Sequence, residues 1–157
     1  MDTTENMITM RDINKYYETG ADPLHVLKDI SLDVKKGEYL AILGPSSSGK
    51  STLMNIIGCM DVAGSGTYNL DGAAIQDAKE KDLVKLRNQK IGFIFQDFRL
   101  FPEYTVRDNI LIPFYLDHRT PDEQMLRKLT EILGIAEKLD ARPSQISGGQ
   151  QQRVAIA

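Results

Sequence analysis

Nine consecutive residues, "GPSSSGKST" from Gly44 to Thr52, combine glycines, hydroxyl groups and one lysine at a spacing suited to phosphate chemistry. Gly44, Gly49, Lys50 and Ser51 satisfy the pattern G-x-x-x-x-G-K-[ST]. In such a loop, successive backbone N–H groups turn inward around an anion, and the start of the following helix adds the positive end of its dipole. The pattern therefore predicts a loop that holds a triphosphate.

Two side chains of this loop have distinct expected roles. Lys50 would reach the β- and γ-phosphates as a point charge, and the Ser51 hydroxyl would take one position on Mg²⁺. The alternative is a plain Gly/Ser-rich connector, but the loop lies between an apolar run and a helical segment, as the motif requires. The residues expected to contact the nucleotide here are Gly44, Pro45, Ser46, Ser47, Ser48, Gly49, Lys50, Ser51 and Thr52.

The elements that must position this loop can be outlined from hydrophobic periodicity. Residues 30–34 alternate apolar and polar side chains, as in a half-buried strand, whereas "YLAIL" at 39–43 is apolar throughout, as in a strand covered on both faces. Residues 51–60 have a helical pattern. Further strands are expected at 7–13, at 67–70 before an Asp71-Gly72 turn, and at 91–95. This order predicts an α/β layered fold with an antiparallel flank near the N-terminus.

A helix is predicted from the segment that begins at Thr120. Thr120 is the expected N-cap, Pro121 the first helical residue, Glu123 the matching acid and Gly134 the end. The apolar residues that fall three and four positions apart predict one buried face, made of Met125, Leu129, Ile132 and Leu133.

Two later segments identify the kind of phosphate-loop protein. "FIFQDF" around Gln96 and "ISGGQQQRVAIA" from Ile146 follow the loop in order, and the whole chain resembles the ATP-binding subunit of ATP-binding cassette (ABC) transporters. The family usually has Leu where this chain has Ile146. The resemblance implies a phosphate-loop NTPase core over residues 1–104 and part of the ABC helical subdomain over 105–157, with the C-terminal part of the domain missing.

The resemblance also implies roles for the "SGGQ" segment, in which Ser147 and Gln150 form a capping box at the start of a last helix. In the family, the serine hydroxyl and the following backbone N–H groups bind a γ-phosphate presented by a second, head-to-tail subunit. Ser147, Gly148, Gly149 and Gln150 are therefore expected to contact ATP. The alternative is a flexible turn that caps a helix without any ligand.

Two further positions match the family. Gln96 resembles the glutamine that touches Mg²⁺ and the attacking water, which makes it, with Lys50, the expected catalytic pair; an ordinary exposed Gln after a strand is the alternative. Tyr17 matches the aromatic residue that stacks on adenine, in preference to its neighbour Tyr16. The loop after Gln96 carries Phe98, Leu100 and Phe101, which either dock a partner or pack in the core.

As a whole, the resemblance implies an ATPase that uses ATP and Mg²⁺ to drive export or lipoprotein release through transmembrane permease subunits. "GPSSSGKSTLMNIIGCMD" and "QQQRVAIA" are most similar to the lipoprotein-release and macrolide- or peptide-export type. One alternative is a non-transport ABC ATPase in cell division, repair or translation. Another is an ATP-binding module without turnover.

Two departures from the family pattern bear on activity. Ser47 stands where the family usually has an internal glycine, and the chain ends ten residues after Ser147. The acidic strand, the glutamate base and the histidine that follow the signature in the family have no counterpart in these residues. His25 and His118 both precede the signature, so neither matches that histidine. These 157 residues alone are therefore expected to be inactive.

Composition limits the other possibilities. A chain of 157 residues with 41% hydrophobic and 26% charged residues predicts one globular domain, and its net charge of -3 disfavours nucleic acid as a partner. The single Cys59, the absence of a signal-peptide pattern and the absence of an apolar run of spanning length indicate the cytoplasm. With permease partners, the expected location is the inner face of the cell membrane.

Overall fold

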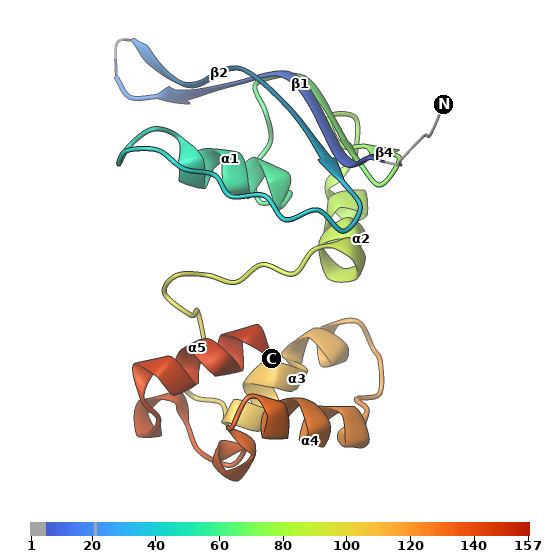
Figure 1. The fold of residues 1–157 in the computed structure, drawn as a ribbon, viewed down its shortest axis with the longest axis vertical. Helices are drawn as coiled ribbons and strands as arrows, with labels where there is room; N and C mark the ends of the chain where they lie inside the picture. The colour runs from blue at the N-terminus through green and yellow to red at the C-terminus, as the bar shows by residue number, and fades with distance from the viewer. Residues whose placement is uncertain (1–5, 21) are drawn as a thin grey trace. The chain divides into compact units, whose positions relative to one another are not determined.

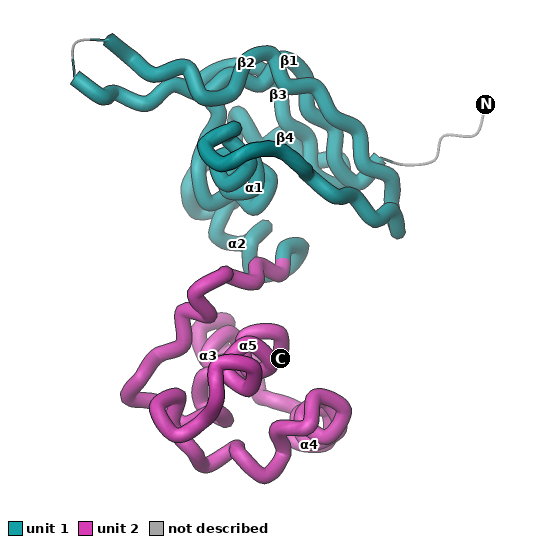
Figure 2. The backbone as a smooth tube through the Cα atoms, turned by 60° about the vertical axis from the view of Figure 1, so that its left-hand side comes forward, with its two compact units in different colours: residues 1–91 teal, residues 92–157 magenta. Residues whose placement is uncertain are grey.

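The computed structural model describes residues 6–20 and 22–157, which form two compact units (Figure 2). The first unit comprises residues 1–91 and the second residues 92–157. The sequence places the boundary between the nucleotide-binding core and the helical subdomain at residues 104/105. That boundary is a division of an ATP-binding domain by function, and it stays a prediction.

The first unit contains a four-stranded antiparallel sheet with the strand order β2-β1-β3-β4 (Figure 1). Its strands are β1 (Asn6–Glu18), β2 (Pro23–Lys35), β3 (Ser65–Leu70) and β4 (Ala73–Ala74). The predicted strands at 7–13, 30–34 and 67–70 and the predicted antiparallel flank are confirmed. Asp71 and Gly72 connect β3 to β4 with φ of 47° and 83°, the left-handed pair that a tight hairpin turn requires.

Two helices complete the first unit, α1 (Lys50–Ile57) and α2 (Glu80–Lys90). α1 lies beside the sheet (Figure 1), and its buried Ile56 packs in one cluster with Met10 and Ile13 of β1 and Leu27 of β2. Leu83 of α2 belongs to the same cluster. This apolar contact fixes the helix that follows the glycine-rich loop against the sheet.

The second unit is helical. It contains α3 (Val106–Leu116), α4 (Glu123–Ile132), α5 (Gly148–Ile156) and two short 3-10 turns, η1 (Ala136–Lys138) and η2 (Pro143–Gln145). The helices share a core that comprises Val106, Ile110, Leu111, Leu126, Ile135, Ile146 and Val154.

Two predicted strands are wrong for this structure. Residues 39–43 and 91–95 have no regular secondary structure, and Tyr39 and Leu43 are 92% and 90% exposed. A strand buried on both faces needs neighbours for its backbone groups, and within the described part of the chain no strand pairs with either segment. Both segments are rich in apolar residues, but none of the described strands supplies the backbone hydrogen bonds that would make either segment a strand.

The helix expected from Thr120 exists but begins later and turns a different face inward. Its N-cap is Asp122, whose side chain accepts hydrogen bonds from the N–H groups of Gln124 and Met125 at 2.9 and 3.0 Å. Leu126 and Thr130 are buried, whereas Met125 and Ile132 are 63% and 73% exposed. The expected cap is therefore wrong, and so are two of the four residues of the expected buried face. The other two, Leu129 and Leu133, are half-buried.

Candidate functional site

The glycine-rich loop leads directly into α1, as its pattern predicts. Two of its residues adopt left-handed backbone conformations, Ser47 with φ 64° and Gly49 with φ 87°. Gly49 is the N-cap of α1, so that Lys50 is the first helical residue and Ser51 the second. Left-handed residues of this kind turn neighbouring N–H groups toward a common point, which is the backbone arrangement that binds anions.

Gly49 is required by space as well as by conformation. A Cβ atom at this position would lie 2.9 Å from Leu27 Cδ2 and 3.1 Å from the Val26 carbonyl oxygen of β2. A side chain there would require the Leu27 side chain, β2 or the start of α1 to shift. The glycine therefore positions the helix N-terminus, and with it the loop.

Lys50 is folded over the loop that precedes it. Its ammonium group donates hydrogen bonds to the carbonyl oxygens of Gly44 and Pro45 at 2.8 and 2.6 Å. The first turn of α1 contains no acidic residue, so nothing in that turn neutralises the positive end of the helix dipole. The Ser51 side chain is exposed beside it. An ammonium, a helix N-terminus and a hydroxyl form a donor set suited to phosphate oxygens.

The two neighbouring tyrosines of β1 differ in their surroundings. The ring of Tyr16 stacks on His25 of β2 with centroids 4.0 Å apart and an interplanar angle of 16°. Tyr17 is 36% exposed, and its hydroxyl donates a hydrogen bond to Asp61 Oδ2 at 2.9 Å. Tyr16, which is 48% exposed, thus already has an aromatic partner, whereas Tyr17 stacks on no other ring among the described residues. Stacking of adenine on Tyr17 stays a prediction.

The segment with the predicted signature begins helix α5 in the second unit. Ser147 Oγ accepts a hydrogen bond from the Gln150 N–H at 3.3 Å, and Gln150 Oε1 accepts one from the Ser147 N–H at 2.8 Å. The predicted capping box is therefore confirmed. Gly148 and Gly149 have open space where a Cβ would lie, so their backbone is accessible to a ligand. Binding of a γ-phosphate by these four residues stays a prediction.

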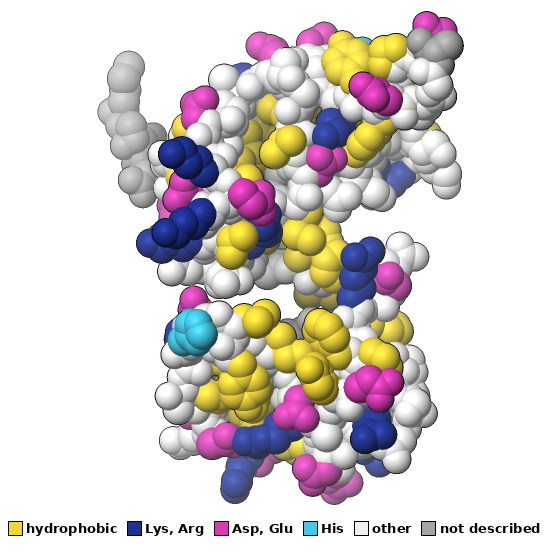
Figure 3. All heavy atoms as spheres, turned by 180° about the vertical axis from the view of Figure 1, so that it is seen from behind, with side chains coloured by type: hydrophobic (Ala, Val, Ile, Leu, Met, Phe, Trp, Pro, Cys, Tyr) yellow, Lys and Arg dark blue, Asp and Glu magenta, His cyan; other side chains and the backbone are white. Residues whose placement is uncertain are grey.

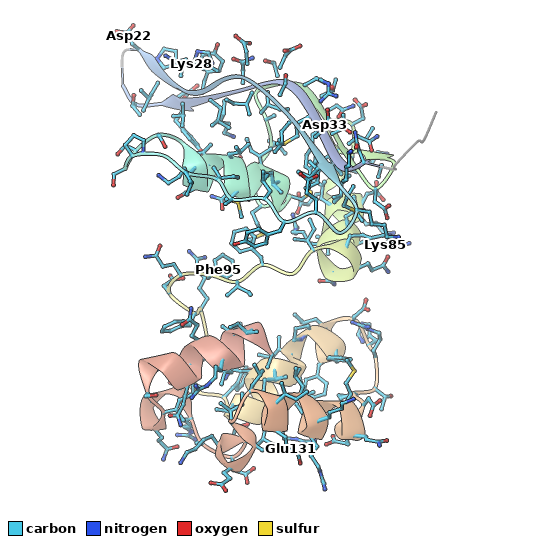
Figure 4. All side chains as sticks on the ribbon, viewed as in Figure 1. Asp22, Lys28, Asp33, Lys85, Phe95 and Glu131 are labelled. Atoms are coloured by element: carbon cyan, nitrogen blue, oxygen red, sulfur yellow. The ribbon has the colours of Figure 1, made fainter. Side chains whose placement is uncertain are left out.

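Gln96 also belongs to the second unit, on the irregular segment that carries Phe95 (Figure 4). The Gln96 side chain is exposed, and the guanidinium of Arg99 lies 4.5 Å from the centroid of the Phe95 ring. The structure thus brings the phosphate-loop residues together in the first unit, while Gln96 and the signature belong to the second. The metal and catalytic roles of Gln96 stay predictions.

The aromatic loop after Gln96 divides between core and surface. Leu100 packs against the core of the second unit, whereas Phe101 is 53% exposed. Phe101 lines a shallow apolar hollow of about 480 Å³ that Tyr104, Asp108, Ile112, Tyr115 and Leu116 complete. Hydrophobic side chains gather on this unit in the space-filling view (Figure 3).

Sequence reasoning missed Asp61, whose carboxylate contacts both Lys15 and Tyr17. Asp61 lies 44 positions from Tyr17, so no local pattern connects them. The only available signal was the spacing of Lys15 and Tyr17, two positions apart on one strand and so able to share a face.

A glycine-rich loop that leads into a helix packed on a sheet defines the class of phosphate-loop nucleotide-binding domains. Comparison with known proteins narrows the class: residues 27–157 match the ABC transporter family, and the chain belongs to that family. Its α/β fold, with the antiparallel sheet and part of the helical subdomain, is that of the ABC cassette phosphate-loop NTPases.

Several relatives are known. The chain is 46% identical to the macrolide export ATP-binding/permease protein MacB of Neisseria meningitidis over 154 residues, which cover 97% of this chain and 24% of that protein. It is 44% identical to the ABC transporter ATP-binding protein YknY of Bacillus subtilis, covering 96% of this chain and 66% of that one. The ATP-binding cassette MJ0796, solved as a dimer bound to ADP and Pi, superimposes with a TM-score of 0.84 at 40% identity, covering 96% of this chain and 67% of that one.

The described part of the chain contains no helix that is both long and apolar enough to cross a membrane.

Proposed function

We propose that this chain is the nucleotide-binding part of an ABC transporter ATPase that couples ATP binding and hydrolysis to export or lipoprotein release. The observation that carries the proposal is the position of Lys50, whose ammonium lies over the phosphate loop at the head of α1. The names of the MacB and YknY relatives support a transporter rather than a non-transport ABC ATPase. Permease subunits would hold the chain at the inner face of the cell membrane.

Nucleotide binding follows from an exchange of partners. The Lys50 ammonium would leave the carbonyls of Gly44 and Pro45 and bind the β- and γ-phosphate oxygens. The loop N–H groups and the start of α1 would bind the remaining phosphate oxygens. Charge-assisted hydrogen bonds to phosphate are stronger than those to neutral carbonyls, which favours the exchange.

Magnesium would bind through the same loop. Within the described residues no group of three or more His, Cys, Asp or Glu side chains could hold a metal, so the ion would depend on the Ser51 hydroxyl, Gln96 and the nucleotide itself. This fits Mg²⁺, which keeps several waters and takes few protein ligands at phosphate sites. When bound, the ion neutralises charge that develops on the phosphates.

Two partners complete the proposal. A second ABC subunit, arranged head to tail, would place Ser147, Gly148, Gly149 and Gln150 at a γ-phosphate. A permease segment with an apolar face would bind the hollow lined by Phe101 and Leu116. Leu116→Ser is expected to weaken co-purification with the membrane subunits, whereas Met60→Ser, on an exposed side chain of the first unit, is not.

The test of nucleotide binding is calorimetric titration of the chain with Mg²⁺-ATP. Lys50→Ala should lower the affinity at least about tenfold because it removes the charge-assisted contacts. Lys28→Ala is the matched control, because Lys28 is an exposed lysine of β2 in the same unit (Figure 4). Equal affinities for the wild-type chain and Lys50→Ala would contradict the proposal.

A further inference from the structure

One carboxylate in the first unit joins a strand to the connection that follows α1. Asp61 Oδ1 accepts a hydrogen bond from the Lys15 ammonium at 2.6 Å, and Asp61 Oδ2 accepts one from the Tyr17 hydroxyl at 2.9 Å. Lys15 and Tyr17 both come from β1, whereas Asp61 lies in the connection that follows α1. The carboxylate therefore ties the end of β1 that carries Tyr17 to the segment just after α1, the helix that begins at the phosphate loop.

The backbone fixes this carboxylate in place. Asp61 Oδ1 also accepts the Val62 N–H at 2.7 Å, and the Lys15 ammonium donates to the Val62 carbonyl at 2.7 Å. The Asp61 N–H in turn donates to the Asn55 carbonyl of α1 at 3.2 Å. Lys15 and Asp61 are thus each held by a second contact, which makes the cluster a defined arrangement rather than a chance surface ion pair.

Burial and charge are consistent with a persistent interaction. The side chains of Lys15 and Asp61 are only 12% and 26% exposed. Burial raises the pKa of Asp61, but the hydrogen bonds from Lys15, Tyr17 and the Val62 N–H outweigh it, so that the pKa lies below its ordinary value. The carboxylate is therefore ionised at neutral pH.

The cluster also fixes the Tyr17 ring. Its hydroxyl is held at Asp61, and the Lys15 ammonium lies over the ring, 5.2 Å from the centroid. Irregularities in the pairing of β1 with β2 on both sides of Lys15 change the local strand direction, as β-bulges commonly do next to functional sites. An exposed tyrosine ring normally samples several rotamers, and this one is restrained at both its hydroxyl and its ring surface.

We infer that Asp61, together with Lys15, is a positioning residue that orients the Tyr17 ring for a nucleobase. The inference rests on the proposed function, in which Tyr17 stacks on adenine. It adds that Asp61, in the connection that follows α1, sets the spacing between the base and the phosphate loop. Asp61 itself touches neither the base nor the phosphates.

The experiment compares two ligands, ATP and inorganic tripolyphosphate, which shares the phosphates but lacks the base. Calorimetry on the wild-type chain, Tyr17→Phe and Asp61→Ala should show ATP affinity about 3- to 10-fold lower in each variant, in keeping with the loss of one hydrogen bond. The affinity for tripolyphosphate should stay unchanged. Asp33→Ala is the matched control, since it removes a carboxylate paired with Arg11 in the same unit, away from Tyr17.

A double-mutant cycle separates positioning from general support of the fold. In the Tyr17→Phe background, Asp61→Ala should have little further effect on ATP affinity, because the contact it removes is already lost. Equal losses for both ligands would show a structural role and overturn the inference, as would unchanged ATP affinity in Tyr17→Phe and Asp61→Ala. Should Asp61→Ala fail to fold, the ATP affinity of Tyr17→Phe still tests the inference. This variant removes only the hydroxyl that contacts Asp61.

Failure of the proposed function has a different signature. Tyr17→Ala should weaken ATP binding without changing tripolyphosphate binding. Full ATP affinity in Tyr17→Ala, or a wild-type chain that binds no ATP, would overturn the base-stacking role and the inference together. Weak binding by Tyr17→Ala with full affinity in Asp61→Ala would overturn the inference alone.

Discussion

At the scale of single residues, Ser47 adopts a backbone conformation that glycine occupies more readily. Its φ of 64° costs a residue with a side chain about 1 kcal/mol. A loop without ligand can relax out of this conformation, whereas phosphates held by its N–H groups require it, so Ser47→Gly is expected to tighten Mg²⁺-ATP binding several-fold. Calorimetric titration measures the change.

The neighbouring serine provides the control for that experiment. Ser46 is not among the described residues with positive φ, so Ser46→Gly should gain nothing and only add backbone freedom to the unfolded chain. Equal or weaker ATP affinity in Ser47→Gly would reject the strain explanation.

The lowered pKa of Asp61 predicts a dependence of stability on pH. Burial raises this pKa, and the bonds from Lys15, Tyr17 and Val62 more than reverse the effect. The unfolded chain takes up the proton near the ordinary value of 3.8, and the folded chain only at lower pH. The stabilisation is thus fully present above 3.8 and is lost as pH falls through the lower folded-state pKa. Urea unfolding at several acidic pH values should show a shallower loss for Asp61→Asn than for the wild-type chain, and identical slopes would contradict the assignment.

At the scale of elements, the start of α4 provides a direct test of which residue caps the helix. Asp122 accepts two backbone N–H groups, so Asp122→Ala should lower the free energy of unfolding by about 1 kcal/mol. Thr120→Ala should change it by less than about 0.5 kcal/mol, because Thr120 is exposed and precedes the cap. Urea denaturation of both variants decides, and a larger loss for Thr120→Ala would restore the capping role expected from the sequence.

The elements that sequence reasoning predicted correctly are determined by residues close together in the sequence. The Ser147–Gln150 capping box and the Asp71-Gly72 turn each depend on residues at most three positions apart, and the alternation over residues 30–34 identifies a strand without reference to anything distant. The phosphate loop belongs to the same group, since its pattern and flanking segments were sufficient to place α1 directly after Gly49.

The elements that it predicted wrongly depend on distant partners. A run such as 39–43 forms a strand only beside other strands, and composition does not supply them. In α4, helical spacing allows a face through Met125 and Ile132 or one through Leu126 and Thr130, and only packing against α3 and α5 selects the second. Asp61 was missed for the same reason, because its two partners lie on another element.

At the scale of the whole molecule, we expect the 157-residue chain to bind ATP without turning it over. Attack on the γ-phosphate by water needs a positioned base, which is typically worth about 10² to 10⁴ in rate. Residues 148–157, which follow Ser147, contain neither Asp nor Glu. Lys50, Ser51 and Gln96 could neutralise and orient phosphate but could not accept the proton efficiently.

A phosphate-release assay on the purified chain tests this expectation. Lys50→Ala serves as the control for contaminating ATPases, and release should be equal in both samples. Sedimentation of the same samples checks for association through exposed apolar side chains such as Tyr39 and Leu43. Robust release that depends on Lys50 would show that a base lies within residues 1–157.

The order of strands in the first unit has a consequence for how the loop forms in time. β1 and β2 are joined by residues 19–22, and β3 and β4 by a two-residue turn, so both hairpins can form within microseconds. The pairing of β1 with β3, which sets Ile8 opposite Leu70, must instead close a loop that contains β2, the phosphate loop and α1. Closing that loop is the slow, entropically costly step. The end of α1 is held by β3, because the Tyr68 hydroxyl donates a hydrogen bond to the Ile57 carbonyl at 2.7 Å. Refolding followed through nucleotide binding should therefore lag behind refolding followed through hairpin formation.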